Sequence, residues 1–200
     1  TPDPKVPYAD SLGELAQLQQ EGKIRHIGIS NVNVAQLEQA RSLVKVLSVQ
    51  NRYNVVDRGS EDVLKACEKA GIAFIPWGPL AKRPPSATGA ANDSLSALEA
   101  IAKERGIGMP QATLAWLLAH SKVMLPIPGT GSLDHLEENV AAAKLRFTAD
   151  ELKRIGYAGA EPCDHPLVTQ ADVRPVGLDG APVLAGADRH HLEEARADVA

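Results

Sequence analysis

Cysteine, aromatic residues and charge of one sign are all scarce in this 200-residue sequence. It has two cysteines, 4% aromatic residues and a formal net charge of −4. Neither Cys67 nor Cys163 belongs to a CxxC pair or has a histidine at ligand spacing, so neither a disulfide framework nor a zinc site is predicted. Cys67 lies in the helical pattern "EDVLKACEKAG" and is expected to be a small core residue. The lack of basic excess argues against nucleic acid as a partner.

Long apolar runs are also missing. No run approaches the ~20 residues that a membrane-spanning helix needs, and the opening "TPDPKVPYAD" does not have the pattern of a signal peptide. With 44% hydrophobic and 23% charged residues, the composition is that of an ordinary globular protein. The sequence therefore predicts a cytoplasmic location and no membrane partner.

Strand patterns alternate with helical patterns along the chain. Alternating strands and amphipathic helices are typical of a parallel sheet with helices outside it. Strands are expected over 24–30, 46–54, 72–80 and 123–130, and helices over 11–23, 33–44, 60–71, 94–106, 109–121, 132–144 and 148–156.

Two architectures contain this alternation, a doubly wound open sheet and a (β/α)₈ barrel. The first normally carries a GxGxxG turn after its first strand, and that spacing does not occur here. A complete barrel has eight strands in about 250 residues. Four strands in an α/β pattern therefore predict half of a (β/α)₈ barrel over residues 1–156.

The composition changes at Tyr157, where alanine, glycine, proline and aspartate become frequent. Residues 157–200 are predicted to form a low-complexity or disordered tail with a weak helical pattern at its end. His190 and His191 lie beside two glutamates there, but adjacent residues do not share a helix face and further ligands are missing. A solvated helix is the favoured interpretation, and no metal site is predicted.

Polar or special residues lie at the end of each expected strand or just beyond it. These are Ser30 and Asn31 at the first, Gln50 at the second, Trp77 with residues 78–80 at the third, and a glycine turn over 129–132 at the fourth. Taken singly, these are a helix N-cap, a strand-end amide, a core aromatic and an ordinary turn. Together, amides for a carboxamide, a flat ring for stacking and backbone N–H groups for phosphate suit a nicotinamide dinucleotide.

Five stretches carry a family resemblance: "GKIRHIGISN", "VQNRYN", "IAFIPWGPLA", "QATLAWLLAHS" and "LPIPGTGSLDHLEENVAAAKLRFTADELKRI". Over about Thr1 to Ile155 the chain resembles the C-terminal half of an aldo/keto reductase. That family reduces carbonyl groups with NADPH on a (β/α)₈ barrel, so the resemblance implies an NADP(H)-dependent oxidoreductase with a small carbonyl substrate.

The resemblance also implies where the cofactor binds. Ser30, Asn31 and Gln50 would hold the nicotinamide carboxamide, and Trp77 would stack on the nicotinamide ring. Residues 78–80 would approach the pyrophosphate, and the implied residues between 129 and 139 would face the adenosine part of the cofactor. The implied residues are Ser30, Asn31, Gln50, Trp77, Gly78, Pro79, Leu80, Gly129, Thr130, Gly131, Ser132, His135, Glu138 and Asn139.

One departure from the family concerns cofactor choice. Many relatives carry lysine after Ile-Pro and arginine at the position of His135, whereas this chain has Gly129 and His135. Histidine loses its charge as the pH rises above about 6.5, so it would hold a 2′-phosphate weakly. NADP(H) is expected, and NAD(H) is left open. Lys82 and Arg83 could supply charge, or could be a solvated pair.

A second departure concerns catalysis. The family's Asp, Tyr, Lys and His tetrad lies on the first four strands, and Thr1 begins just after the place of that histidine. No catalytic residue is assigned, because Tyr8, Tyr53 and Tyr157 lie in no matching motif. A fragment of a reductase is expected. The alternative is a non-catalytic nucleotide-binding or regulatory half-barrel that dimerises or docks on a partner. A phosphate-binding isomerase or lyase explains fewer of the residues, and the oligomeric state is left open.

Overall fold

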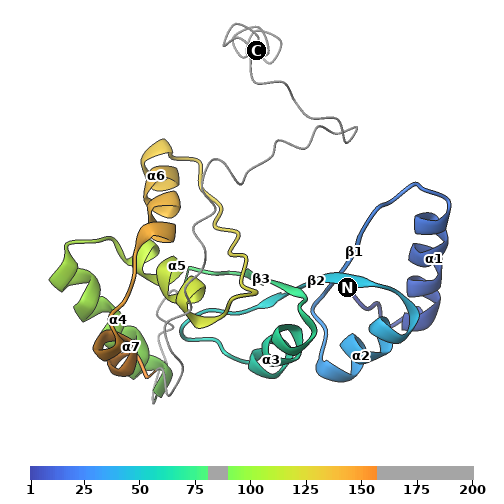
Figure 1. The fold of residues 1–200 in the computed structure, drawn as a ribbon, viewed down its shortest axis with the longest axis horizontal. Coiled ribbons are helices and arrows are strands. Elements are labelled where there is room, and N and C mark those ends of the chain that lie inside the picture. Colours follow the sequence, from blue (N-terminus) through green and yellow to red (C-terminus); the bar gives the residue numbers. More distant parts are fainter. Residues whose placement is uncertain (81–89, 157–200) are drawn as a thin grey trace, which may run out of the picture. The chain divides into compact units, whose positions relative to one another are not determined.

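The structure is a computed structural model that describes residues 1–80 and 90–156, and in it strands alternate with helices (Figure 1). The expected order of elements over these residues is confirmed except for the fourth strand, with boundaries shifted by up to four residues. The elements are α1 (Tyr8–Gln20), β1 (Ile27–Ser30), α2 (Val34–Leu43), β2 (Val46–Arg52), α3 (Glu61–Ala70), β3 (Ala73–Trp77), α4 (Ala90–Arg105), α5 (Met109–His120), α6 (Leu133–Ala141), the 3₁₀ turn η1 (Ala142–Lys144) and α7 (Ala149–Arg154).

The three strands form a parallel sheet in the order β1-β2-β3. Ser30 lies opposite Gln50 across the first pair, and Arg52 lies opposite Trp77 across the second. Because parallel strands all end at the same edge, this register brings the residues after each strand together. The fold is therefore α/β with parallel strands, and it covers part of a barrel.

The expected fourth strand over 123–130 is wrong in its extent. Only an isolated parallel bridge between Phe74 and Met124 forms, with the Phe74 N–H donating to Val123 O at 2.7 Å and the Leu125 N–H donating to Phe74 O at 2.8 Å. Pro126 and Pro128 interrupt the rest of the segment. Proline has no N–H for a ladder, so the pairing stops after one bridge.

Local signals in the sequence explain where several helices begin and end. Asn33 caps α2 in a capping box with Gln36, and Thr148 caps α7 in a capping box with Glu151. α3 ends at Gly71, whose φ of 64° lies in the left-handed region that glycine adopts without a steric cost. These ends fix the helices that cover the sheet.

The core lies between the sheet and its helices. Val49 of β2, Phe74 of β3, Leu37 of α2 and Cys67 of α3 each have 0% exposure. The prediction that Cys67 is a core residue is thus confirmed, and burial raises the pKa of its thiol to about 11. This thiol is neutral at physiological pH.

Helix α6 differs from the other long helices because it contains no buried residue. Leu133, Leu136 and Val140 are 70%, 50% and 61% exposed, and their i, i+3, i+7 spacing places them on one face. We call these three residues the α6 apolar stripe. Leu125 and Ile127, in the segment before the helix, are 54% and 48% exposed. Within residues 1–80 and 90–156, nothing covers this apolar surface.

Several sequence predictions fall outside the described residues. The tail over 157–200, the domain boundary at residue 156, the pair Lys82 and Arg83, and the histidines at 190 and 191 all belong to this group, so they stay predictions. None of the helices that the structure describes is long and apolar enough to cross a membrane.

Candidate functional site

Four predicted residues meet where β1, β2 and β3 end. The Ser30 hydroxyl donates to the backbone oxygen of Gln50 at 2.7 Å, and the Asn31 N–H donates to the same oxygen at 3.0 Å. The Trp77 indole N–H donates to Asn31 Oδ1 at 2.9 Å. The four residues predicted at the strand ends thus form a cluster in which hydrogen bonds connect the ends of three strands.

The cluster needs an unusual backbone at Asn31. Its φ is 54°, in the left-handed region that asparagine tolerates better than most residues. The turn carries the side chain of Asn31 across to Trp77, which is 46 residues further along the chain. Asn31 is thus held by the fold, whereas the expected N-cap role belongs to Asn33.

The side-chain amides of this cluster have hydrogen-bonding capacity to spare. In the part of the chain that the structure describes, the half-buried side-chain amide of Gln50 has no hydrogen-bond partner. Asn31 uses its Oδ1 on Trp77 and leaves its Nδ2 for another acceptor. Polar groups placed this way at a strand-end edge can bind a ligand carboxamide.

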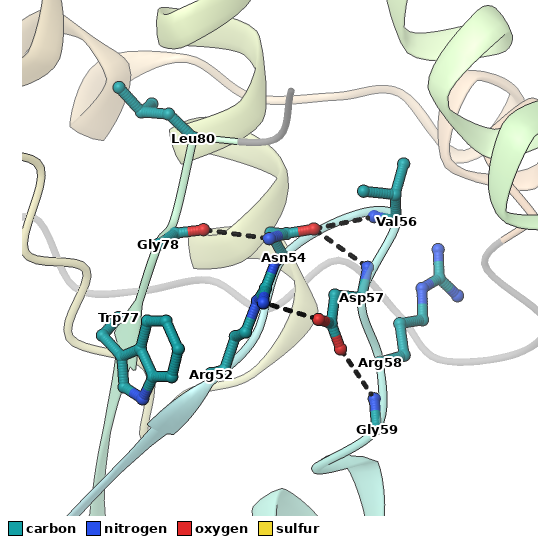
Figure 2. Close-up of a pocket in the computed structure, with 9 residues that line it drawn as sticks. All are labelled: Arg52, Asn54, Val56, Asp57, Arg58, Gly59, Trp77, Gly78 and Leu80. Atoms are coloured by element: carbon teal, nitrogen blue, oxygen red, sulfur yellow. Dashed lines mark hydrogen bonds and ion pairs between the residues drawn. The ribbon is translucent and has the colours of Figure 1, made fainter. Parts of the chain in front are cut away.

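Next to the cluster is an open cavity of about 650 Å³ (Figure 2). Asn54 lines it. Its Nδ2 donates to Gly78 O at 2.9 Å, while its Oδ1 accepts the N–H groups of Val56 at 3.0 Å and Asp57 at 2.9 Å. Asn54 therefore ties the loop after β2 to the loop after β3. The lining residues are Arg52, Asn54, Val56, Asp57, Arg58, Gly59, Trp77, Gly78 and Leu80.

Two arginines give the cavity its charge. The Arg52 guanidinium lies 5.4 Å from the centroid of the Trp77 ring, and its Nε pairs with Asp57 Oδ2 at 2.9 Å. Arg58 projects from the same loop, but its side chain turns away from Asp57 (Figure 2). Arg52 is thus neutralised by an ion pair, whereas Arg58 forms none with the residues that the structure describes.

The predicted adenosine-side residues form a separate, exposed group. Ser132 is the N-cap of α6 and accepts the His135 N–H at 3.5 Å, while Thr130 Oγ1 accepts the Ser132 N–H at 3.1 Å. Thr130 Oγ1 also lies 3.5 Å from His135 Nδ1. Glu138 is exposed and Asn139 is half-buried further along the helix. Two N–H groups of the turn are already bonded, so fewer face outward than the sequence suggested.

The structure does not bring all the predicted residues into one cavity. Trp77, Gly78 and Leu80 line it, whereas buried Pro79 and the residues from Gly129 to Asn139 are not among its described lining. The predicted set therefore falls into a strand-end group and an α6 group.

Sequence reasoning missed a partly buried polar network of Tyr53, Glu61 and His120. The Tyr53 hydroxyl donates to Glu61 Oε2 at 2.5 Å and lies 2.7 Å from His120 Nε2. Trp116 stacks on the His120 ring with centroids 4.8 Å apart. The members are up to 67 residues apart in the chain, so no local spacing could have indicated the network.

The contacts within this network favour an ionised Glu61 and a neutral Tyr53. The hydrogen bond from His120 is the main cause that lowers the pKa of Glu61 to about 2. Burial, with the hydrogen bond to Glu61, raises the pKa of Tyr53 well above its usual range. Tyr53 is 0% exposed, so its neutral hydroxyl holds Glu61 and His120 together and cannot reach a substrate in this structure.

Comparison with known proteins adds family evidence. The model of the aldo/keto reductase family matches residues 1–158. The chain is 44% identical over 157 residues to an uncharacterized oxidoreductase of Schizosaccharomyces pombe, covering 78% of this chain and 49% of that protein. It is 39% identical over 145 residues to pyridoxine 4-dehydrogenase of Escherichia coli, covering 72% and 48%.

A solved structure of the same family is also similar to this chain. An aldo-keto reductase from Klebsiella pneumoniae in complex with NADPH matches with a TM-score of 0.65 and 25% identity, over 80% of this chain and 57% of that one. The chain spans about half the length of the two curated relatives it matches.

Proposed function

This chain belongs to the aldo/keto reductase family, and we propose that it is the cofactor-binding part of an NADP(H)-dependent oxidoreductase that reduces aldehyde or ketone carbonyls to alcohols. The observation that supports this most is the strand-end cluster, where Asn31 and Trp77 are hydrogen-bonded beside the free amide of Gln50. No residue of this sequence is assigned as the proton donor.

The cluster fits a nicotinamide in shape and in chemistry. Trp77 is half-buried at the wall of the 650 Å³ cavity and offers a flat aromatic surface for stacking. Gln50 and Asn31 would hold the carboxamide, and Ser30 would keep its backbone link to β2. When bound, the nicotinamide supplies or accepts a hydride. The role of this chain's residues is to bind and orient the ring.

For the adenosine end, we propose the residues around the start of α6. Thr130 and His135 are exposed there, Ser132 is half-buried, and an α-helix N-terminus favours an anionic group. Glu138 and Asn139 would bind the adenine. His135 is the expected contact for a 2′-phosphate, so NADP(H) is proposed as the cofactor and NAD(H) as a weaker alternative.

The test is a titration of the protein with NADPH, followed by tryptophan emission. Quenching is expected because Trp77 would contact the ring, and Trp77→Phe should remove most of it. Gln50→Ala should weaken binding by about tenfold, the effect of losing one or two hydrogen bonds. Gln39→Ala, which changes an exposed glutamine of α2, is the matched control. A folded sample that shows no quenching would contradict the proposal.

A second candidate function rests on the exposed apolar surface. The α6 apolar stripe, with Leu125 and Ile127, is the kind of patch that proteins bury against a partner. A non-catalytic nucleotide-binding subunit that dimerises or docks would use it. Sedimentation of the chain with and without NADPH would distinguish a defined complex from non-specific aggregation.

A further inference from the structure

Arg58 is a cation without an acidic partner in the described chain. Its guanidinium lies 4.9 Å from the centroid of the Trp116 ring, and its Nη2 donates to Ser94 Oγ at 3.4 Å. Its Nε is buried and has no hydrogen-bond acceptor. The half-buried side chain is thus held in place by a ring and a hydroxyl, neither of which neutralises its charge.

The neighbouring acid is already committed elsewhere. Asp57 pairs through Oδ2 with Arg52, and its Oδ1 accepts the Gly59 N–H at 3.3 Å. Among the described residues that line the cavity there are two arginines and one aspartate, which leaves one net positive charge, and that charge is on Arg58. Figure 2 shows the Asp57 carboxylate directed toward Arg52 and the Arg58 side chain directed away from it.

An unneutralised, half-buried guanidinium beside a cavity is suited to bind an anion. Partial burial of a charge without a counter-ion is unfavourable, and an anion in the cavity would relieve it. The planar guanidinium matches the geometry of carboxylate and phosphate. The cavity volume of about 650 Å³ is within the range of small-molecule sites.

We propose that Arg58 binds an oxyanion in this cavity, and that the oxyanion is the carboxylate of an acidic carbonyl substrate. The assignment to a substrate rests on the proposed function, because it assumes that the cofactor occupies the Trp77 side. Trp77 and Gly78 line the same cavity as Arg58, so an anion at Arg58 and a ring at Trp77 share one space. A phosphate of the cofactor is the other possible source of the same chemistry.

The experiment uses the whole protein labelled with ¹⁵N-arginine, with succinate as the carboxylate probe, inorganic phosphate as the second anion, and succinamide as the neutral control. Binding is followed by the Arg58 Nε–H resonance and by tryptophan emission. Succinate is expected to shift the Arg58 signal, and succinamide is not. Arg58→Gln should weaken succinate binding about tenfold to a hundredfold, as expected for a charge-assisted contact.

Two variants control for indirect effects. Arg25→Gln removes an exposed arginine outside the cavity lining and should leave succinate affinity within about twofold, typical of a change away from the site. Arg58→Lys keeps the charge without the planar fork and should retain part of the affinity. If Arg58→Gln does not fold, the resonance shift in the unaltered protein still decides the question.

Saturating NADPH separates the two sources of the anion. Succinate that still binds beside NADPH supports the substrate carboxylate. Competitive displacement of succinate and phosphate by NADPH would overturn it in favour of a cofactor phosphate. If neither anion moves the Arg58 signal, the anion site itself is wrong, even where NADPH binds. Succinate binding without any NADPH binding would support the anion site and contradict the proposed function.

Discussion

At the scale of single residues, Asn31 shows how a strained backbone can serve a site. A non-glycine residue with a φ of 54° has a steric cost, and here the turn carries the side-chain oxygen that accepts the Trp77 N–H. A residue with a different side chain would lose the contact, and a residue with a bulkier Cβ environment would strain the turn further.

The comparison of Asn31→Ala with Asn31→Gly separates these two effects. Both remove the acceptor for Trp77 and should shift its emission, but only alanine retains the Cβ in a left-handed conformation. We expect Asn31→Ala to have a lower urea midpoint than Asn31→Gly, corresponding to a free energy of unfolding that is lower by about 1 kcal/mol. Equal stability of the two variants would mean that the backbone strain at this turn is negligible.

Gly28 offers a second test of close packing. A Cβ built on it would lie 2.5 Å from Ser48 Oγ, across the β1–β2 pairing. Gly28→Ala is therefore expected to lower the free energy of unfolding by about 1–3 kcal/mol, as overpacking does. Ser48→Ala should relieve the loss in a double variant.

The control for Gly28 lies in α1. A Cβ on Gly13 would meet nothing within 4 Å, so Gly13→Ala should raise stability by about 0.5–1 kcal/mol through helix propensity. Urea denaturation of Gly28→Ala, the double variant and Gly13→Ala measures all these effects. A Gly28→Ala protein as stable as the parent would show that Ser48 can move aside without loss.

Residue-level reasoning from sequence had clear limits. It placed Ser30, Asn31, Gln50 and Trp77 at one sheet edge because parallel strands share a polarity. It could not find Tyr53, Glu61 and His120 together, because nothing in the chain marks which end of α5 packs over the loop after β2. Nor could it show that Asp57 pairs with Arg52 and that Arg58 has no acidic partner among residues 1–80 and 90–156.

At the scale of elements, the Tyr53 network joins α3 and α5 to the segment after β2, because Tyr53 is the first residue beyond that strand. Glu61 is the first residue of α3 and His120 is the last residue of α5. The hydrogen bond between Tyr53 and Glu61, together with the 3.4 Å contact of His120 Nε2 with the same carboxylate, therefore fastens two helix ends to the residue that follows β2. Loss of the carboxylate charge should loosen all three elements.

Acid unfolding tests this role of Glu61. Its pKa is lowered to about 2 in the folded protein, first by the hydrogen bond from His120, from an ordinary value of 4.5. A lowered pKa in the folded state contributes stability above about pH 4.5, and this stability is lost as the pH falls toward 2. Glu61→Gln should therefore flatten the fall of unfolding free energy between pH 5 and pH 2, measured with urea.

Glu68→Gln is the matched control for that experiment, because Glu68 is an exposed carboxylate on the same helix. It should leave the acid limb of the profile unchanged. Identical profiles for Glu61→Gln and the parent would show that the network does not depend on the charge of Glu61.

For helix α6 we expect substitutions to have little effect on the free energy of unfolding, since the helix contributes no buried residue. Replacing Leu136 by glutamine should change the free energy of unfolding by less than about 0.5 kcal/mol and reduce the binding of a hydrophobic dye. Leu37→Ala, at a residue with 0% exposure, should cost about 2–5 kcal/mol. A large loss in Leu136→Gln would mean that the chain covers this helix.

Helix boundaries could be predicted from the sequence where it contains capping residues, as at Asn33, Gly71 and Thr148. The segment after α5 could not be predicted in this way, although its apolar residues fit a strand. Its two prolines remove donors, and its pairing depends on neighbours that periodicity alone cannot supply. Strand extent is thus a property of the sheet more than of the segment.

At the scale of the whole molecule, the sequence predicted an α/β class and a partial barrel, and the structure shows parallel strands with the same order of elements. The half-barrel itself stays a prediction. β1 pairs with β2 alone in the described chain, and β3 has only the Met124 bridge on its other side. How these edges are completed depends on residues that periodicity cannot assign.

The buried thiol of Cys67 is a chemical probe for the opening of helix α3. A neutral thiol with no exposure reacts with alkylating reagents only while α3 is open, so its labelling rate reports the frequency of opening. Under native conditions we expect labelling of Cys67, located by peptide mapping, to be at least about a hundredfold slower than in urea, the protection expected when opening costs a few kcal/mol. Fast native labelling would indicate frequent opening of α3. If bound NADPH slows it further, the residues that hold the cofactor and the helix that carries Cys67 open as one unit.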